Sequence, residues 1–275
     1  MFTKLPLLLL ATLPLAAETK LAVRDGETFT YKVSWSVLPG AGEIRFFAAA
    51  DTTGATPRLR ITTTTQTRGL ASMLFPFNAM AESTFDLASG RLVALTESST
   101  QRNKKSEHAV TFDYATAQAH YSVPGSNETP RALPMPAGDP MDLITSLVQT
   151  RSWDLKPGDK RDALVLFDDD FYELTIHVAR AEEIRTSLGT FQTLVLEPRM
   201  DKTAPKGMFK RGSTARVWIT QDERRLPVKF EVEFKVGRGV AMLTRYDAPV
   251  PTKTTESKPA VAKIPASSDA KNSRP

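Results

Sequence analysis

The stretch Leu226-Pro227-Val228-Lys229-Phe230-Glu231-Val232-Glu233-Phe234-Lys235-Val236 decides how this chain is built. Every even position is apolar, and every odd position is polar or proline. A period of two predicts a β-strand with one buried face and one solvated face. We therefore expect Phe230 and Phe234 to face the interior, and the charged residues at the odd positions to face solvent.

The same alternation recurs along the chain. Phe29, Tyr31, Val33 and Trp35 alternate with polar residues, and a turn at residues 38–42 follows them. Further strands are predicted at residues 44–48, 58–67, 79–86, 92–100, 107–114, 117–123, 163–167, 171–181, 192–199, 213–220, 226–236 and 240–246. Short strands separated by turn sequences are typical of an antiparallel meander. The predicted fold class is mainly β, as an antiparallel curved sheet or a half-open β-barrel.

One segment has helical rather than strand spacing. Its apolar residues are Leu143, Ile144, Leu147 and Val148. Asp139 is placed to cap the helix and Pro140 to occupy its first position, and the helix is expected to run to about Ser152. We expect this single amphipathic helix to cover the concave face of the sheet.

The N-terminal end resembles a secretory signal peptide. Lys4 precedes an apolar run at residues 5–15, and Leu15-Ala16-Ala17 offers small residues for cleavage. This pattern predicts a signal peptide at residues 1–17. The alternative is a short N-terminal anchor that stays uncleaved. The run is shorter than the roughly 20 apolar residues of a spanning helix, so no spanning segment is expected after signal removal.

The chain contains no cysteine. It therefore has no disulfide, no thiolate metal site, no cysteine nucleophile and no lipid-modified cysteine. An exported chain of this kind fits the bacterial periplasm better than a eukaryotic secretory route, where small domains depend on disulfides. We predict a soluble, non-lipidated periplasmic protein.

The C-terminal end has a different composition from the rest. Residues 248–275 are rich in Pro, Lys, Thr, Ala and Ser and carry a net charge of +3, and they are predicted to be a disordered tail. The whole chain has a net charge of +5, and Lys4 contributes +1, so residues 18–247 carry only +1. We interpret residues 18–247 as a single all-β domain, and its near-neutral charge argues against nucleic-acid binding.

No catalytic constellation is evident. None of the three histidines lies at metal-ligand spacing from another, and His108 shares the apolar phase of its strand. Asp168-Asp169-Asp170 is interpreted as a hairpin turn, with a Ca²⁺ site as the alternative. No cofactor or metal is predicted. A basic run between Arg199 and Arg216 is interpreted as a solvated connection, or else as a receptor for an anionic head group.

Apolar and aromatic residues are the candidate site residues instead. Residues 69–77 form a Met-, Leu- and Phe-rich segment, predicted as a loop or short helical turn. It is interpreted as filling the core, with the lining of a pocket as the alternative. The predicted cavity-lining residues are Phe29, Tyr31, Trp35, Leu74, Phe75, Phe77, Phe230 and Phe234.

The order of several short motifs resembles a family of exported bacterial proteins, the domain-of-unknown-function 3108 family. The motifs are Gly26–Tyr31, Ala41-Gly42, Gly69–Ser72, a helix with Asp139 and Asp142 that ends at Arg151, Pro157-Gly158, Gly189–Phe191, Glu197-Pro198, Val217–Thr220 with Asp222, and Arg225–Val228. The resemblance implies no established activity for any residue. At the level of fold, the closing strands are also similar to the half-open barrels of periplasmic lipoprotein carriers, which implies a sheet wrapped around a hydrophobic cavity.

Three functions remain open on the sequence. The first is non-enzymatic binding of a lipid or another apolar or amphiphilic envelope ligand in a curved-sheet cavity. The second is a structural or assembly protein of the cell envelope that binds a protein partner on an edge strand. The third is a hydrolase of envelope polymers, which would require Asp168, Glu182 and a histidine to meet in one cleft.

Overall fold

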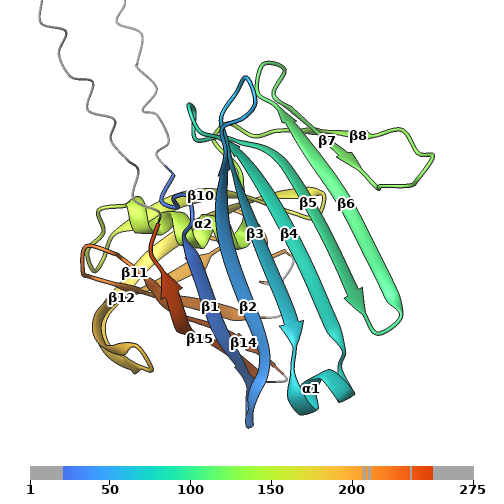
Figure 1. Ribbon diagram of the computed structural model, residues 1–275. Helices are drawn as coiled ribbons and strands as arrows, with labels where there is room; N and C mark the ends of the chain where they lie inside the picture. The colour runs from blue at the N-terminus through green and yellow to red at the C-terminus, as the bar shows by residue number, and fades with distance from the viewer. Residues whose placement is uncertain (1–20, 207–208, 210–211, 236, 250–275) are drawn as a thin grey trace, which may run out of the picture.

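Strand β1 (Thr28–Trp35) lies in the middle of the sheet, with both of its edges paired to other strands. In the computed structural model, residues 21–206, 209, 212–235 and 237–249 are described, and their strands form one curved sheet (Figure 1). Phe29 and Tyr31 alternate with polar residues along β1, and both are buried. The apolar side chains that alternate along β1, such as Phe29 and Tyr31, therefore lie on the concave face of the sheet.

The chain leaves β1 as a meander and later returns to its other edge. The first half of the sheet contains β2 (Leu38–Asp51), β3 (Arg58–Thr67), β4 (Phe77–Asp86), β5 (Leu92–Gln101), β6 (Lys104–Asp113), β7 (Gln118–Ser122) and β8 (Arg131–Pro134). The second half contains β9 (Met141–Asp142), β10 (Lys160–Phe167), β11 (Asp170–Thr186), β12 (Gly189–Arg199), β13 (Thr214–Thr220), β14 (Pro227–Phe234) and β15 (Gly237–Asp247). The strand order is β8-β7-β6-β5-β4-β3-β2-β1-β15-β14-β13-β12-β11-β10-β9.

The predicted antiparallel curved sheet is confirmed, with one exception to the pairing. Every neighbouring pair of the described strands is antiparallel except β9 and β10, which are parallel. No hydrogen-bonded strand pair joins β8 to β9 in this part of the chain, so the sheet stays open. The half-open barrel is the form that the sheet adopts.

Side chains bring the two ends of the sheet together without closing it. Leu166 of β10 is fully buried and packs with Leu95 and Val110 of the opposite half. In the β10–β11 turn, Asp168 accepts a hydrogen bond from the Tyr121 hydroxyl at 3.2 Å. Arg131 of β8 forms an ion pair with the neighbouring Asp169. These contacts hold the turn of one half against the edge of the other.

Helix α2 (Leu143–Gln149) lies between the two halves of the sheet, and a 3-10 turn at Thr150–Ser152 continues it. Its N-cap is Asp142, whose Oδ1 accepts a hydrogen bond from the Thr145 backbone N–H at 2.9 Å. The predicted cap at Asp139 is therefore wrong. The reason is tertiary: Met141 and Asp142 pair with β10 and stay extended, which delays the start of the helix.

A buried ion pair fixes the C-terminal end of this helical segment. The Arg151 guanidinium lies 2.8 Å from Glu27 Oε1, and their side chains are 9% and 2% exposed. Arg151 also donates to the backbone carbonyls of Ala22, Arg224 and Arg225. The residues just before β1, the helical segment and the β13–β14 turn therefore meet at one guanidinium.

Helix α1 (Gly69–Leu74) connects β3 and β4 at the other end of the strands (Figure 1). It is the short helical turn that the sequence allows, and none of its residues is buried. The predicted signal peptide at residues 1–17 and residues 250–275 of the predicted tail lie outside the described residues. In the described part, no helix is long and apolar enough to cross a membrane.

Candidate ligand pocket

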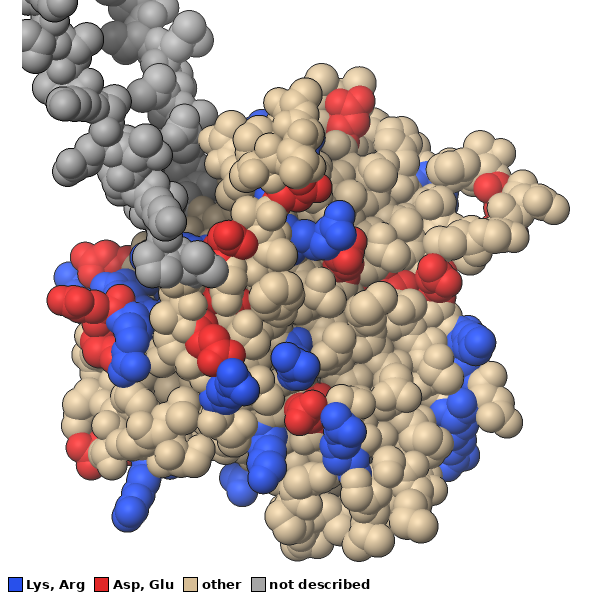
Figure 2. Space-filling view, in the orientation of Figure 1, with Lys and Arg blue, Asp and Glu red and all other residues tan. Residues whose placement is uncertain are grey.

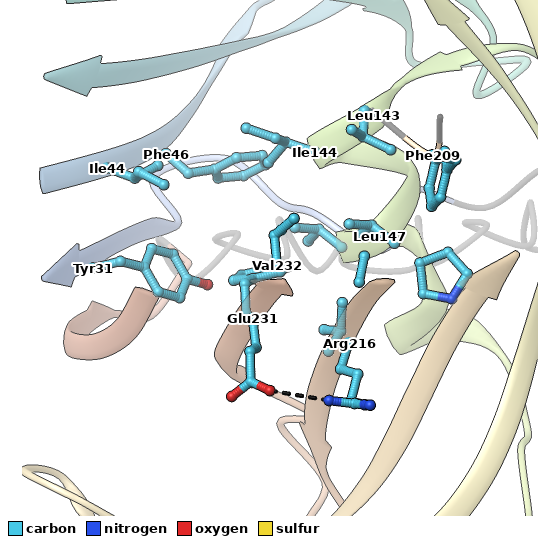
Figure 3. A pocket seen from close by; sticks show the side chains of 15 residues that line it. Tyr31, Ile44, Phe46, Leu143, Ile144, Leu147, Phe209, Arg216, Glu231 and Val232 are labelled. Atoms are coloured by element: carbon cyan, nitrogen blue, oxygen red, sulfur yellow. Dashed lines mark hydrogen bonds and ion pairs between the residues drawn. The ribbon is translucent and has the colours of Figure 1, made fainter. Parts of the chain in front are cut away.

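An apolar pocket lies between α2 and the concave face of the sheet (Figure 3). Its cavity volume is about 160 Å³. The lining residues are Tyr31, Ile44, Phe46, Leu143, Ile144, Leu147, Val148, Pro198, Phe209, Ala215, Arg216, Val217, Phe230, Glu231 and Val232. Because a dry engineered cavity of roughly 150 Å³ accepts benzene, this space has room for a ring or a short length of alkyl chain.

Both halves of the sheet and the helix contribute to the lining. The period of two places Ile44 and Phe46 of β2 on the same face as Tyr31 of β1, since Ile44 pairs with Tyr31. Across the pocket, Val217 of β13 pairs with Phe230 of β14. The apolar face of α2 lies over these strands, as the helical spacing predicts. The pocket is the space left where a single short helix packs against a wide, strongly curved sheet.

Polar atoms at the pocket are satisfied by the protein itself. The Tyr31 hydroxyl donates a hydrogen bond to the Pro227 carbonyl at 2.9 Å. Burial raises the pKa of Tyr31 well above its usual value, so this phenol stays neutral. The ring of Tyr31 meets that of Phe230 edge to face at 5.2 Å. The wall therefore presents ring carbons rather than an unpaired donor.

The charged residues at the rim form a network with one another. Arg216 lies 3.1 Å from Glu231 and 3.3 Å from Glu197, and Lys229 lies 2.9 Å from Glu231. Figure 3 shows the Arg216–Glu231 pair pointing away from the apolar side chains. Burial by itself raises the pKa of Glu231, but the hydrogen bond from Lys229 and the nearby cations hold it below its usual value. Glu231 is thus an ionised, buried residue.

Glu231 corrects one expectation about the solvated face. It lies on the outer face of β14, as the alternation predicts, yet it is only 6% exposed. Arg216 and Lys229 cover it, and the Lys229 ammonium lies 3.7 Å from the centre of the Trp218 ring. Long cationic side chains can shield a neighbouring residue with their apolar stems, which a strand pattern cannot reveal.

A second hollow adjoins the pocket. It has a cavity volume of about 500 Å³ and shares Pro198, Phe209, Ala215 and Arg216 with the first. Met200 and Pro205 extend the apolar wall past Phe209. Together the two spaces reach the size of ordinary small-ligand sites, which is roughly 300–1,000 Å³. Arg199 also lines this hollow, but its guanidinium is paired with Glu197.

The eight predicted cavity residues do not come together in one place. Tyr31 and Phe230 line the pocket. Phe29 is fully buried beside Phe46 and Tyr246, and it fills the core instead. The other residues of the predicted set lie elsewhere.

Trp35 and Phe234 stack on each other at 5.8 Å, near the β14–β15 turn. Gly237 follows this turn with a φ of +138°, and an added Cβ would lie 3.1 Å from the Trp35 ring nitrogen. Leu74 and Phe75 are exposed at α1, at 58% and 61%, and Phe77 is half-buried at the start of β4. For Trp35 and Phe234 the alternation predicts the phase but not the position along the strand, and that position decides whether a side chain reaches the pocket. Residues 74–77 have no alternation, so their phase was not predicted.

A polar cluster on the concave face was not predicted. Glu97 of β5 pairs in register with His108 of β6, and Glu97 Oε2 lies 3.4 Å from His108 Nε2. Asp168 Oδ1 lies 3.9 Å from His108 Nδ1 across the open end of the sheet. Burial first, and then the charges of Asp142 and Asp168, raise the pKa of Glu97 to about 7. Burial also lowers the pKa of His108.

This cluster combines two carboxylates and one imidazole. His108 lies on the apolar face of its strand, as the sequence predicts, and its Nε2 atom has no hydrogen-bond partner in this part of the chain. The Ser83 hydroxyl donates to Asp142 Oδ2 at 2.7 Å and not to the imidazole. Glu182 pairs with Arg180 and does not join Asp168 and a histidine. In the part of the chain that the structure describes, no group of three or more His, Asp or Glu side chains is placed to hold a metal ion.

A family model described as "Protein of unknown function (DUF3108)" matches residues 30–244, from β1 to β15. The chain belongs to the DUF3108 family. Among curated proteins, none matches the DUF3108 chain significantly.

Two solved structures are similar to the DUF3108 chain. One is a β-barrel-like protein of the DUF1849 domain of unknown function from Brucella abortus, with a TM-score of 0.51 and 7% identity over 82% of this chain and 99% of that one. The other is described as "a putative lipoprotein" from Parabacteroides distasonis, with a TM-score of 0.33 and 13% identity over 81% of this chain and 95% of that one. The first likeness shows a β-barrel-like fold.

Some pocket residues of this DUF3108 protein could have been found from the sequence. Ile44 and Phe46 continue the strand alternation, and Leu143, Ile144 and Leu147 form the predicted covering face of the helix. Val217 shares the apolar phase of its strand. The pairing of β1 with β15, which brings β13 and β14 opposite β2, could not be predicted from the sequence. Without that long-range pairing, no local signal indicates which apolar residues share a cavity.

Proposed function

We propose that this DUF3108 protein binds the alkyl chain of an apolar or amphiphilic envelope ligand, such as a fatty acyl lipid, without transforming it chemically. The observation that carries the proposal is the pocket under α2, whose wall consists almost entirely of apolar side chains from both halves of the sheet. Enclosed apolar spaces of this kind favour alkyl groups because transfer from water releases roughly 25 cal/mol per Å² of apolar surface.

The shape of the space supports an elongated ligand. The first pocket takes only a ring or a short alkyl length, but the adjoining hollow past Phe209 provides a continuous apolar wall through Pro198 and Ala215. Export to the bacterial periplasm, as the N-terminal pattern predicts, would place the protein where acyl lipids are the abundant apolar molecules.

The alternative of an assembly protein that captures a partner strand has weaker support. Strand addition needs an exposed edge with unpaired backbone groups. The two edge strands here are β8, of four residues, and β9, of two. Residues 160–164 of β10 also lie at this edge, because β9 pairs only with Val165 and Leu166. Short edge strands, and charged side chains such as those of Lys160, Arg161 and Asp162, are a common protection against pairing with another chain.

Binding can be tested with a fluorescent fatty acid on purified protein. Ala215 lines both hollows, so Ala215→Phe places a phenyl ring in a space that holds about one such ring. We expect the dissociation constant for the probe to rise at least about tenfold, which corresponds to the loss of roughly 1.4 kcal/mol of binding free energy. Unlabelled palmitate should displace the probe from the unmodified protein.

The matched control is Ala181→Phe on β11, where the alanine is exposed. It makes the same substitution on a strand but away from the pocket, and its probe affinity should stay unchanged. Circular dichroism checks that both variants keep the sheet. Equal probe affinity for the Ala215 and Ala181 variants, or a probe that palmitate does not displace, would show that the pocket is not the binding site.

A further inference from the structure

A group of large apolar side chains lies exposed at the α1 end of the strands. We call it the α1 tip, and it consists of Val37, Leu70, Met73, Leu74 and Phe75. Val37 is 90% exposed and Met73 is 79% exposed. In Figure 2 the end of the molecule that carries α1 is largely free of acidic side chains and projects beyond the rest of the surface. Exposed apolar clusters on a monomer mark surfaces that contact something else.

Backbone hydrogen bonds hold the α1 tip in this exposed position. The Arg68 N–H donates to the Ala41 carbonyl at 2.9 Å, which anchors the start of α1 to β2. The Arg102 N–H donates to the Pro76 carbonyl at 2.9 Å, which ties the β5–β6 turn to the end of the α1 segment. The side chains therefore project from a fixed platform, and no element of the described part of the chain buries them.

Cations surround the α1 tip. The turn segments 36–42, 67–77 and 101–106 together contain Arg68, Arg102, Lys104 and Lys105 and no Asp or Glu. All four of these basic residues are exposed, and the Arg102 guanidinium lies 5.6 Å from the centre of the Phe75 ring. Among the described residues, Arg68 forms an ion pair with Glu43 at 3.1 Å, and no ion pair is found for Arg102, Lys104 or Lys105. The tip therefore combines apolar side chains with an excess of positive charge.

The opposite end of the same strands has different chemistry. Its turns contain Asp51, Asp86 and Asp113, each of which accepts hydrogen bonds from its own turn. Arg58 at that end is paired with Asp86 at 2.8 Å. The positive excess and the exposed apolar side chains thus coincide at one end of the sheet.

We propose that the α1 tip is a docking surface for an anionic phospholipid membrane. Exposed Met, Leu and Phe side chains can enter the boundary between head groups and acyl chains, and the surrounding lysines and arginines are attracted to anionic head groups. A neutral protein groove would match the apolar residues but would leave the cations without a partner. This proposal does not depend on the proposed function, because vesicle binding measures the surface and not the pocket.

The test is co-flotation of the protein, purified from a periplasmic fraction, with vesicles of phosphatidylcholine containing 30% phosphatidylglycerol, or of phosphatidylcholine alone. Met73→Ser with Phe75→Ser should weaken binding to the anionic vesicles at least about tenfold. Lys104→Ser with Lys105→Ser should weaken it about 30-fold at low salt, with a smaller effect at high salt. None of these side chains is buried, so the fold should be unaffected.

Controls at other surfaces make single substitutions of the same kind, from an apolar residue or a lysine to serine. Leu87→Ser changes an exposed leucine at the opposite end of the strands, and Lys160→Ser changes an exposed lysine on β10. Both should bind vesicles like the unmodified protein. Equal binding to vesicles with and without phosphatidylglycerol would overturn the proposal, as would unchanged binding in both tip variants, which would assign lipid attraction to another part of the chain. Self-association that the tip variants abolish, in the absence of vesicle binding, would show that the surface contacts a second copy instead.

Discussion

The buried pair of Arg151 and Glu27 gives the sharpest prediction about stability. Replacement of Arg151 by Met keeps the apolar length of the side chain and removes the guanidinium. Glu27 would then be a carboxylate in a site where only 2% of its side chain is exposed. Removal of one partner of such a pair typically costs about 3–5 kcal/mol, because the other charge remains buried and unpaired.

The contacts around Glu27 place the expected loss in the lower part of that range. The carboxylate keeps hydrogen bonds from the Tyr246 hydroxyl at 2.8 Å and from the Arg24 backbone N–H at 3.1 Å. Two of the carbonyls that Arg151 contacts, those of Arg224 and Arg225, lie in the surface turn between β13 and β14 and can bind water instead. We therefore expect Arg151→Met to lower the free energy of unfolding by about 3 kcal/mol, which is a melting temperature lower by about 10 °C.

The measurement is urea unfolding followed by tryptophan fluorescence, arranged as a double-mutant cycle. Glu27→Gln in the Arg151→Met background removes the unpaired charge and should recover about 1–2 kcal/mol of the loss. Arg224→Met, which breaks an exposed pair with Asp222, should cost less than about 1 kcal/mol. A loss below 1 kcal/mol for Arg151→Met, or strict additivity in the cycle, would refute the assignment of the pair as the junction of these segments.

Two further predictions concern the open end of the sheet. The pKa of Glu97 in the folded protein is about 7, above its ordinary value of 4.5. Between pH 4.5 and 7 the folded state therefore binds one more proton than the unfolded state does at this residue. The free energy of unfolding consequently falls as the pH rises through this range. The change in unfolding free energy caused by Glu97→Gln should therefore be about 1–3 kcal/mol more favourable at pH 8 than at pH 4.5. Urea unfolding at both pH values measures it, and equal effects at the two pH values would contradict this reasoning. Leu166→Ala should cost about 3 kcal/mol, because the leucine is fully buried between the two ends of the sheet, whereas Phe167→Ala, at an exposed position, should cost less than about 1 kcal/mol in the same assay. Similar losses for these two variants would show that the ends of the sheet are not packed together as described.

Local patterns predict most of the strands. Residues 58–67 coincide with β3, and the predictions for β13 and β15 differ from the structure by only a few residues at their ends. Turn chemistry also holds at Asp168, which adopts a φ of +58° between β10 and β11. These features depend on neighbouring residues, since alternation and turn preference act over a few positions.

The candidate site was predictable only in part. Tyr31 and Phe230 line the pocket, because both have the inward phase of their strands. Leu74 and Phe75 were expected in the same cavity, yet they lie at the α1 tip, because the β3–β4 connection ends at the far end of the strands. Hydrophobicity alone does not distinguish a residue that lines a cavity from one that faces solvent.

The sequence by itself determined the mainly β fold, the inward phase of strands such as β1 and β14, and a helix that covers the concave face, because these follow from periodicity along the chain. Only the tertiary structure decided that β1 pairs with β15, that the sheet stays open, and that Glu97 meets His108 and Asp168. Those features join residues far apart in the chain, and they depend on the twist of the whole sheet and on the packing of α2 within it. The strand at Leu226–Val236 predicted which side chains face inward, and the fold decided which of them reach a pocket.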